Sequence, residues 1–233
     1  MTLKVISFDL DHTLWDPLPA LRAGDAAQWD CLGRLSPDVL VYRDPSRLGV
    51  ERHALLQQQP ELQHNVTLLR QVLIARLCRQ VGVADRQAVS IAKRAFEAFM
   101  AHRHDVVIDS AAQPLLRQLA QRYTLVALTN GNADVYRTPL GPFFQHAWRA
   151  EDVGSSKPEP GMFLKALETT GIAADAMVHI GDSLKDDVGG AQRAGVKSIW
   201  LTQETNASHS GADAVAAGLA EIPAAIAKLE QND

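Results

Sequence analysis

Apolar and polar positions divide the chain into three stretches of different character. The first is a mostly apolar run over residues 4–9, with Val5, Ile6 and Phe8, that ends in the acidic loop Asp9-Leu10-Asp11. A short apolar run bounded by a loop is typical of a buried strand in a parallel sheet. Residues 1–16 therefore predict one such strand and the loop that follows it.

Residues from about 17 to 104 show helical periodicity and no convincing strand. Apolar side chains recur at helical spacing between Thr67 and Val81, with Gly82 as a fitting stop. A second series runs from Ile91 to Phe99, and prolines punctuate the earlier part. This stretch predicts a bundle of about four helices.

Strand-like and helical runs alternate after His104. Such alternation indicates a parallel sheet covered by helices. Strands are predicted for residues 123–128, 176–180 and 196–201, and helices from Pro114 onward, for 161–170, for 188–194 and for part of the alanine-rich run 212–227. The expected fold is α/β: a doubly wound parallel sheet from residues 1–16 and 105–233, with residues 17–104 inserted after the first strand as a helical domain.

Composition and charge narrow the class of partner. The chain has 233 residues, 46% of them hydrophobic, and a formal net charge of -4, so no global positive field favours nucleic acid or an anionic membrane. No segment has the length and apolarity of a membrane span or signal peptide. The two cysteines, Cys31 and Cys78, lie far apart and lack metal-ligand spacing. We therefore expect a cytoplasmic protein that binds a small anion, if any, through a few local donors and a metal.

Three of the predicted strands end in polar residues, namely Asp9, Thr129 and Asp182. Ligands of open α/β sheets bind outside the carboxyl ends of the strands. Residues far apart in the sequence are therefore expected to converge on one site.

Asp9 and Asp11 are the most informative pair. Two carboxylates this close repel each other, so either their pKa values should separate or a cation must hold one of them ionised. One could then act as a nucleophile or metal ligand and the other as a proton carrier. The alternative is a solvated acidic turn with a structural role only.

Three further motifs are weak when taken singly. Thr129-Asn130-Gly131 offers a hydroxyl and backbone N–H groups to an anion, or forms a simple capped turn. Lys157 lies before Pro158 near a helix start and could neutralise phosphate, although most lysines are solvated. Gly181-Asp182 with the later Asp186-Asp187 suits a hard cation, or provides an acidic first helical turn.

The order of these motifs resembles the haloacid dehalogenase (HAD) superfamily. Residues 8–14, Phe-Asp-Leu-Asp-His-Thr-Leu, resemble its first motif, Thr129 its second, Lys157 its third, and Gly181 to Asp187 its fourth. The resemblance covers roughly residues 1–16 and 105–215. His12 stands where Asp or Gly is frequent, and it either alters the pH dependence or faces solvent.

The resemblance implies a magnesium-dependent phosphatase that forms an aspartyl-phosphate on a small phosphorylated metabolite. It implies these roles: Asp9 as nucleophile; Asp11 as general acid and base; Asp9, the Asp11 carbonyl and Asp182 as Mg²⁺ ligands; Thr129, the Asn130 N–H and Lys157 as phosphate-binding groups; and Asp187 as a group that orients Lys157 or a metal-bound water. The insert resembles the family's helical cap. Trp15 is the first candidate for a wall of the leaving-group pocket, ahead of Trp29 and Arg22, and packing in a cap or hinge is its alternative role.

Other activities share this core. A 2-haloacid dehalogenase uses the same nucleophile without a metal, but usually carries an aromatic residue at the position of Asp11. A phosphohexose mutase keeps both aspartates, and a non-catalytic binding module remains a third alternative. Residues 128–133 and 179–191 are similar to bacterial flavin mononucleotide phosphatases, some of which act on a ribitylamino-pyrimidine phosphate of riboflavin synthesis.

Overall fold

The computed structural model describes residues 2–204 and 210–231, and the chain forms two compact units. One unit, the core, consists of residues 1–16 and 107–233; the other, the insert, consists of residues 17–106. The second junction lies two residues beyond the predicted border at 104/105.

The core contains a six-stranded parallel sheet, as the alternation of strand-like and helical runs predicts. Its order is β5 (His146–Arg149), β4 (Thr124–Thr129), β1 (Val5–Phe8), β6 (Met177–Gly181), β7 (Lys197–Leu201) and β8 (Ala214–Ala216). Strand β1 is central and fully buried. The chain builds outward from β1 on one side and then on the other, so the crevice at its carboxyl end is the expected ligand site.

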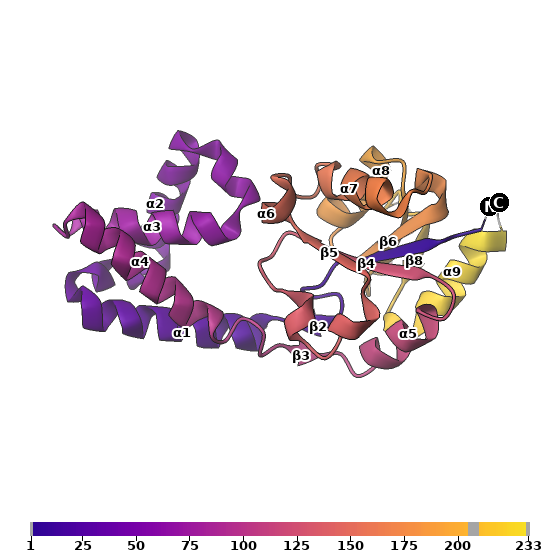
Figure 1. Cartoon of the computed structure of the whole chain (residues 1–233), viewed down its shortest axis with the longest axis horizontal. Coiled ribbons are helices and arrows are strands. Elements are labelled where there is room, and N and C mark those ends of the chain that lie inside the picture. The colour runs from indigo at the N-terminus through magenta and orange to yellow at the C-terminus, as the bar shows by residue number, and fades with distance from the viewer. Residues whose placement is uncertain (1, 205–209, 232–233) are drawn as a thin grey trace. The chain divides into compact units, whose positions relative to one another are not determined.

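Helices cover both faces of this sheet (Figure 1). They are α5 (Ala112–Leu119), α6 (Ala150–Val153), α7 (Gly161–Thr170), α8 (Gly189–Arg193) and α9 (Ile222–Gln231). Phe163 of α7 and Ala191 of α8 pack with Val126, Leu128 and Met177 of the sheet, while α5 and α9 lie on the opposite face. This is the doubly wound arrangement.

The insert is helical throughout: residues 17–106 are all described and contain no strand. It comprises α1 (Leu18–Leu35), α2 (Pro45–Gln58), α3 (Val66–Gln80) and α4 (Asp85–Met100), with 3-10 turns at Pro37–Arg43 and Pro60–His64. Ile91, Ala95 and Phe99 recur every four residues along α4 and are buried. Trp29 belongs to the insert's own hydrophobic core and Arg22 is exposed, so the structure places Trp29 as a packing residue.

The sequence analysis did not predict four of the strands. Strand β2 (Trp15–Asp16) pairs antiparallel with β3 (Val107–Ile108), and the two stand at the junctions with the insert. Strand β5 forms one edge of the main sheet and β8 the other. Strand β8 lies near the start of the alanine-rich run 212–227, and the helix expected for part of that run is α9, which begins at Ile222.

Candidate active site

The carboxyl ends of β1, β4 and β6 bring the predicted side chains together. Phe8 pairs with Ala127 on one side and with Ile180 on the other, so the next residue, Asp9, lies between the ends of β4 and β6. One depression in the core is lined by Asp9, Asp11, His12, Thr129, Asn130, Gly131, Lys157, Asp182, Ser183, Asp186 and Asp187. Every predicted site residue except Trp15 lies on it.

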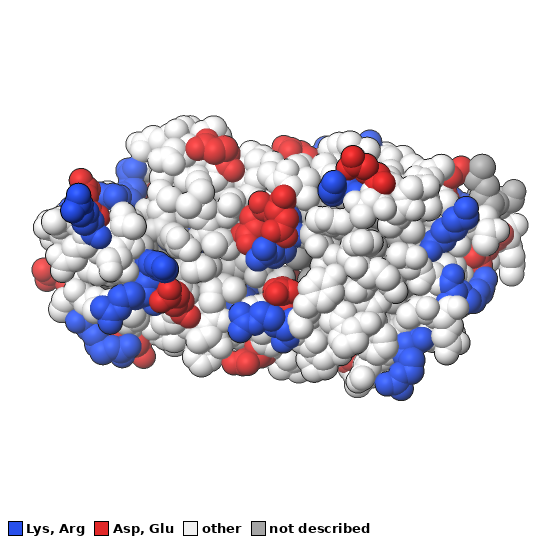
Figure 2. Space-filling view, viewed as in Figure 1, with Lys and Arg blue, Asp and Glu red and all other residues white. Residues whose placement is uncertain are grey.

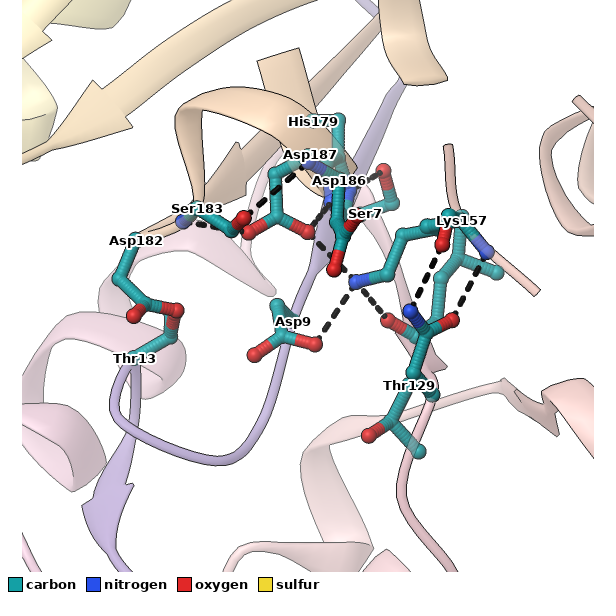
Figure 3. A network of polar contacts seen from close by, with 12 residues as sticks. Ser7, Asp9, Thr13, Thr129, Lys157, His179, Asp182, Ser183, Asp186 and Asp187 are labelled. Atoms are coloured by element: carbon teal, nitrogen blue, oxygen red, sulfur yellow. Dashed lines mark hydrogen bonds and ion pairs between the residues drawn. The ribbon is translucent and has the colours of Figure 1, made fainter. Parts of the chain in front are cut away.

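Lys157 is the central cation of this depression (Figure 3). Its ammonium Nζ donates to Asp9 Oδ1 at 2.7 Å, to Asp187 Oδ1 at 2.6 Å and to the Leu128 carbonyl at 2.7 Å. The side chain is only 1% exposed, which distinguishes it from a solvated surface lysine. The ammonium thus bridges two carboxylates that would otherwise repel each other.

Asn130 has a role that sequence reasoning missed. Its side-chain amide donates to the Lys157 carbonyl at 2.9 Å, and its side-chain oxygen accepts from the Lys157 N–H at 2.8 Å. The Asn130 side chain therefore fixes the backbone that carries the ammonium, whereas the prediction assigned only its own N–H to phosphate. Thr129 Oγ1 accepts from the Gly131 N–H at 3.1 Å, so its hydroxyl proton can be donated to an anion.

Asp187 is held from several directions. Oδ1 accepts from Lys157 and from His179 Nε2, the latter at 3.0 Å, and Oδ2 accepts from the Ser183 N–H at 2.9 Å. An ionised carboxylate only accepts hydrogen bonds, so Nε2 carries the imidazole proton and Nδ1 accepts from Ser7 Oγ at 2.8 Å. Gly181 is required beside this group, because a Cβ there would overlap the Asp187 carboxylate.

Ser7 and His179 were also missed. They lie opposite each other in the register of β1 and β6, and both are fully buried. The available signal was a polar side chain in each of two otherwise apolar strands. Their connection to Asp187 depends on the lateral pairing of strands that are distant in sequence.

The electrostatics follow from burial and from two carboxylates, Asp9 and Asp187, that contact one ammonium. Burial raises the pKa of Asp9 to about 8, even though Lys157 lowers it. Burial also raises the pKa of Asp182, helped by the charge of Asp187. Burial opposes ionisation of Asp187, but the Lys157 ammonium and the His179 hydrogen bond hold its pKa well below the usual range. Conversely, Asp187 and Asp9 raise the pKa of Lys157 despite its burial.

The donor set fits a hard divalent cation. Oxygen atoms of Asp9, Asp182 and Asp187 lie within 4.8 Å of one another, and carboxylate oxygens are the ligands that Mg²⁺ takes. Asp187 is already engaged by Lys157, His179 and Ser183, whereas the bond that Asp182 accepts from Thr13 Oγ1 is long, at 3.4 Å. A bound cation would favour the ionised form of Asp9 against the burial and the Asp187 charge that raise its pKa.

Trp15 lies in the core beside this depression. It is buried, and its indole N–H donates to Asp11 Oδ1 at 2.7 Å. It lines a neighbouring hollow with His12, Thr13, Asp16 and residues 107–109. The intervening His12 is exposed and has φ +65°.

This fold and site define the class of the protein. Residues 3–195 match the haloacid dehalogenase-like hydrolase family, and the chain belongs to it. The chain is 31% identical over 204 residues to the 5-amino-6-(5-phospho-D-ribitylamino)uracil phosphatase YigB of Escherichia coli, covering 87% of this chain and 84% of the relative. It is 27% identical to a phosphoglycolate phosphatase of Pseudomonas putida, covering 87% and 71%. The predicted family and enzyme class, a hydrolase whose relatives are phosphatases, are confirmed.

Solved structures agree on the fold. A crystal structure described as a 2-haloacid dehalogenase from Pseudomonas syringae has a TM-score of 0.89 at 36% identity, covering 97% of this chain and 99% of that one. YfnB of Bacillus subtilis, a HAD hydrolase bound to magnesium, has a TM-score of 0.64 at 22% identity, with coverage of 97% and 100%, and supports the fold alone.

Two features of the structure concern the binding partners of the protein. Among the described residues, no helix is long and apolar enough to span a membrane. On the face shown in Figure 2, basic and acidic side chains are interspersed over the surface, in keeping with the small net charge of -4.

Proposed function

We propose that this protein is a magnesium-dependent phosphatase that hydrolyses a small phosphate monoester through an aspartyl-phosphate on Asp9. The observation that carries the proposal is the buried contact of Asp9 with the Lys157 ammonium, in a depression that also holds a second carboxylate, Asp11. A carboxylate beside a fixed cation can attack phosphorus. A second carboxylic acid can supply the proton that an alkoxide leaving group needs.

The residues would divide the reaction as follows. An oxygen of Asp9 forms a bond to phosphorus while the bond to the ester oxygen breaks, and Asp11 gives its proton to that oxygen. In the second half, Asp11 takes a proton from water as the water oxygen attacks phosphorus, and Asp9 is released. The Thr129 hydroxyl, the Asn130 N–H and the Lys157 ammonium would hold the phosphoryl oxygens where charge develops.

Asp9, Asp182 and the Asp11 carbonyl would hold the Mg²⁺, and Asp187 would orient Lys157. When bound, the cation supplies positive charge that lets an anionic phosphate approach an anionic carboxylate. The insert would act as a cap that supplies the leaving-group pocket. The likeness to YigB supports a ribitylamino-pyrimidine phosphate, or flavin mononucleotide, as the first substrates to test.

A phosphatase panel tests the proposal directly. Phosphate release would be measured with flavin mononucleotide, a ribitylamino-pyrimidine phosphate, phosphoglycolate, sugar phosphates and nucleotides, with Mg²⁺ and with excess chelator. We expect turnover of at least one small ester that requires Mg²⁺. Undiminished turnover in chelator would refute the metal role, and conversion of a sugar phosphate to its isomer without phosphate release would indicate a mutase.

The 36% identical structure described as a 2-haloacid dehalogenase supports a second candidate. Halide leaves as a stable anion and needs no proton, so Asp11 would have no task in that reaction. Asp9→Asn should inactivate either enzyme and cannot discriminate. Halide release from 2-chloropropionate, with no phosphate released from any ester, would establish the dehalogenase and refute the phosphatase.

A further inference from the structure

Trp15 and Asp11 are joined through both side chain and backbone. The indole Nε1–H of Trp15 donates to Asp11 Oδ1 at 2.7 Å. The His12 N–H donates to the Trp15 carbonyl at 2.8 Å, and Asp11 and Trp15 also form a short backbone bridge. This turn has His12 in the left-handed region at φ +65°, which few non-glycine residues adopt without support from their surroundings.

The Trp15 ring is itself fixed. Trp15 begins β2, pairs with Ile108 of β3 and is 2% exposed. The Asp109 N–H donates to the Leu14 carbonyl at 3.1 Å next to this pair. The indole therefore has little freedom to leave Asp11, and its N–H restrains the position of the Oδ1 atom that it contacts.

We propose that Trp15 is a positioning residue that determines which oxygen of Asp11 carries the transferred proton. Oδ1 accepts the indole N–H, so we expect the carboxylic proton of Asp11 to be carried by Oδ2 and donated from there to the leaving oxygen. A general acid loses efficiency when its proton points away from the group it protonates. The inference rests on the proposed phosphatase function, in which Asp11 is the general acid.

Leaving-group dependence separates this role from packing. Trp15→Phe keeps an aromatic ring but removes the N–H. We expect kcat/KM for an alkyl phosphate, which reports only the steps up to formation of the aspartyl-phosphate, to fall about tenfold; this is less than the ~10²–10⁴-fold that a whole general acid contributes. The kcat/KM for p-nitrophenyl phosphate, whose leaving group needs little protonation, should change far less.

Two comparisons complete the experiment. Trp29→Phe alters a buried tryptophan in the insert's core and should affect the two substrates equally. In an Asp11→Asn background, Trp15→Phe should have no further selective effect on the alkyl phosphate, because the proton it positions is gone. If Trp15→Phe fails to fold, site-specific replacement of Trp15 by benzothienylalanine, which keeps the bicyclic shape without the N–H, provides the same comparison.

The outcomes distinguish the inference from the function beneath it. If the wild type hydrolyses phosphate esters but loss of the N–H lowers kcat/KM equally for both substrates, or for neither, the positioning role is overturned and the phosphatase stands. A selective effect that persists at full size in the Asp11→Asn background also overturns it. If the wild type hydrolyses no phosphate ester, both the proposed function and this inference are refuted.

Discussion

At the residue scale, the site depends on a buried chain of polar contacts that continues beneath the catalytic depression. Ser7 Oγ contacts His179 Nδ1, His179 Nε2 contacts Asp187, and Asp187 contacts Lys157. All four side chains are buried. A buried polar group is stable only when its hydrogen bonds are satisfied, so each member requires the next.

This series of buried contacts predicts that the free energy of unfolding depends on pH. Burial lowers the pKa of His179 in the folded protein, whereas an unfolded histidine titrates near ~6.5. Below that pH the unfolded chain binds more protons, so the stability contributed by neutral His179 is complete above about 6.5 and is lost as the pH falls. The unfolding free energy of His179→Gln should therefore decline less than that of the wild type as the pH falls. Urea titrations at several pH values, with a metal chelator present, measure this decline.

His53→Gln is the matched control, because His53 is exposed on α2 and its replacement should leave the decline as in the wild type. An unchanged decline in His179→Gln would contradict the assignment of a neutral imidazole.

Residue identities were more predictable than their connections. Asp9, Asp11, Thr129, Lys157, Asp182 and Asp187 were all singled out from motif order and strand ends, and the structure gathers them at one depression. Their catalytic roles stay predictions. Strand register brings Ser7 and His179 together, and loop packing brings the Asn130 side chain to the Lys157 backbone. Sequence spacing does not encode either contact.

At the element scale, two helical glycines of the insert should respond oppositely to alanine. A Cβ on Gly24 of α1 would lie 2.8 Å from the Phe99 ring and carbonyl, whereas one on Gly49 of α2 would meet nothing within 4 Å. We expect Gly24→Ala to destabilise by about 1–3 kcal/mol through overpacking. Gly49→Ala should stabilise by about 0.5–1 kcal/mol through helix propensity.

Chemical unfolding of the two variants beside the wild type measures both effects. If both variants changed the free energy of unfolding equally and with the same sign, the α1–α4 contact would not control the packing of the insert.

Helices and strands were predicted correctly where the local sequence pattern was strong. Helix α7 was predicted at its observed bounds, because glycine and helical periodicity agree there. Strand β8 was missed because an alanine-rich run favours helix intrinsically, and only pairing with β7 makes it a strand. Strands β2 and β3 have two residues each, too few for a period to be recognised.

At the scale of the whole molecule, the insert leaves and re-enters the core through one antiparallel pair. Asp16 and Val107 are direct partners in that pair, so an Asn-Gly turn can join them as a two-residue hairpin. The core has its own hydrophobic cluster. A chain with residues 17–106 replaced by Asn-Gly should therefore fold and unfold cooperatively.

If the insert supplies the leaving-group pocket, this shortened chain should lose turnover of small metabolites yet retain slow hydrolysis of p-nitrophenyl phosphate. Circular dichroism and the two assays measure fold and activity separately. A shortened chain that is folded and hydrolyses small metabolites as well as the full chain would contradict the role of the insert as a cap.

The central claim is that Asp9 attacks phosphorus, and acid-quenched single-turnover mixing with a phosphate ester tests it most directly. The account predicts that peptide mass spectrometry finds one phosphoryl group, located on Asp9, during the first turnover, and none in Asp9→Asn. Phosphate released at the wild-type rate with Asp9 never modified, or with the phosphoryl group on another residue, would contradict it.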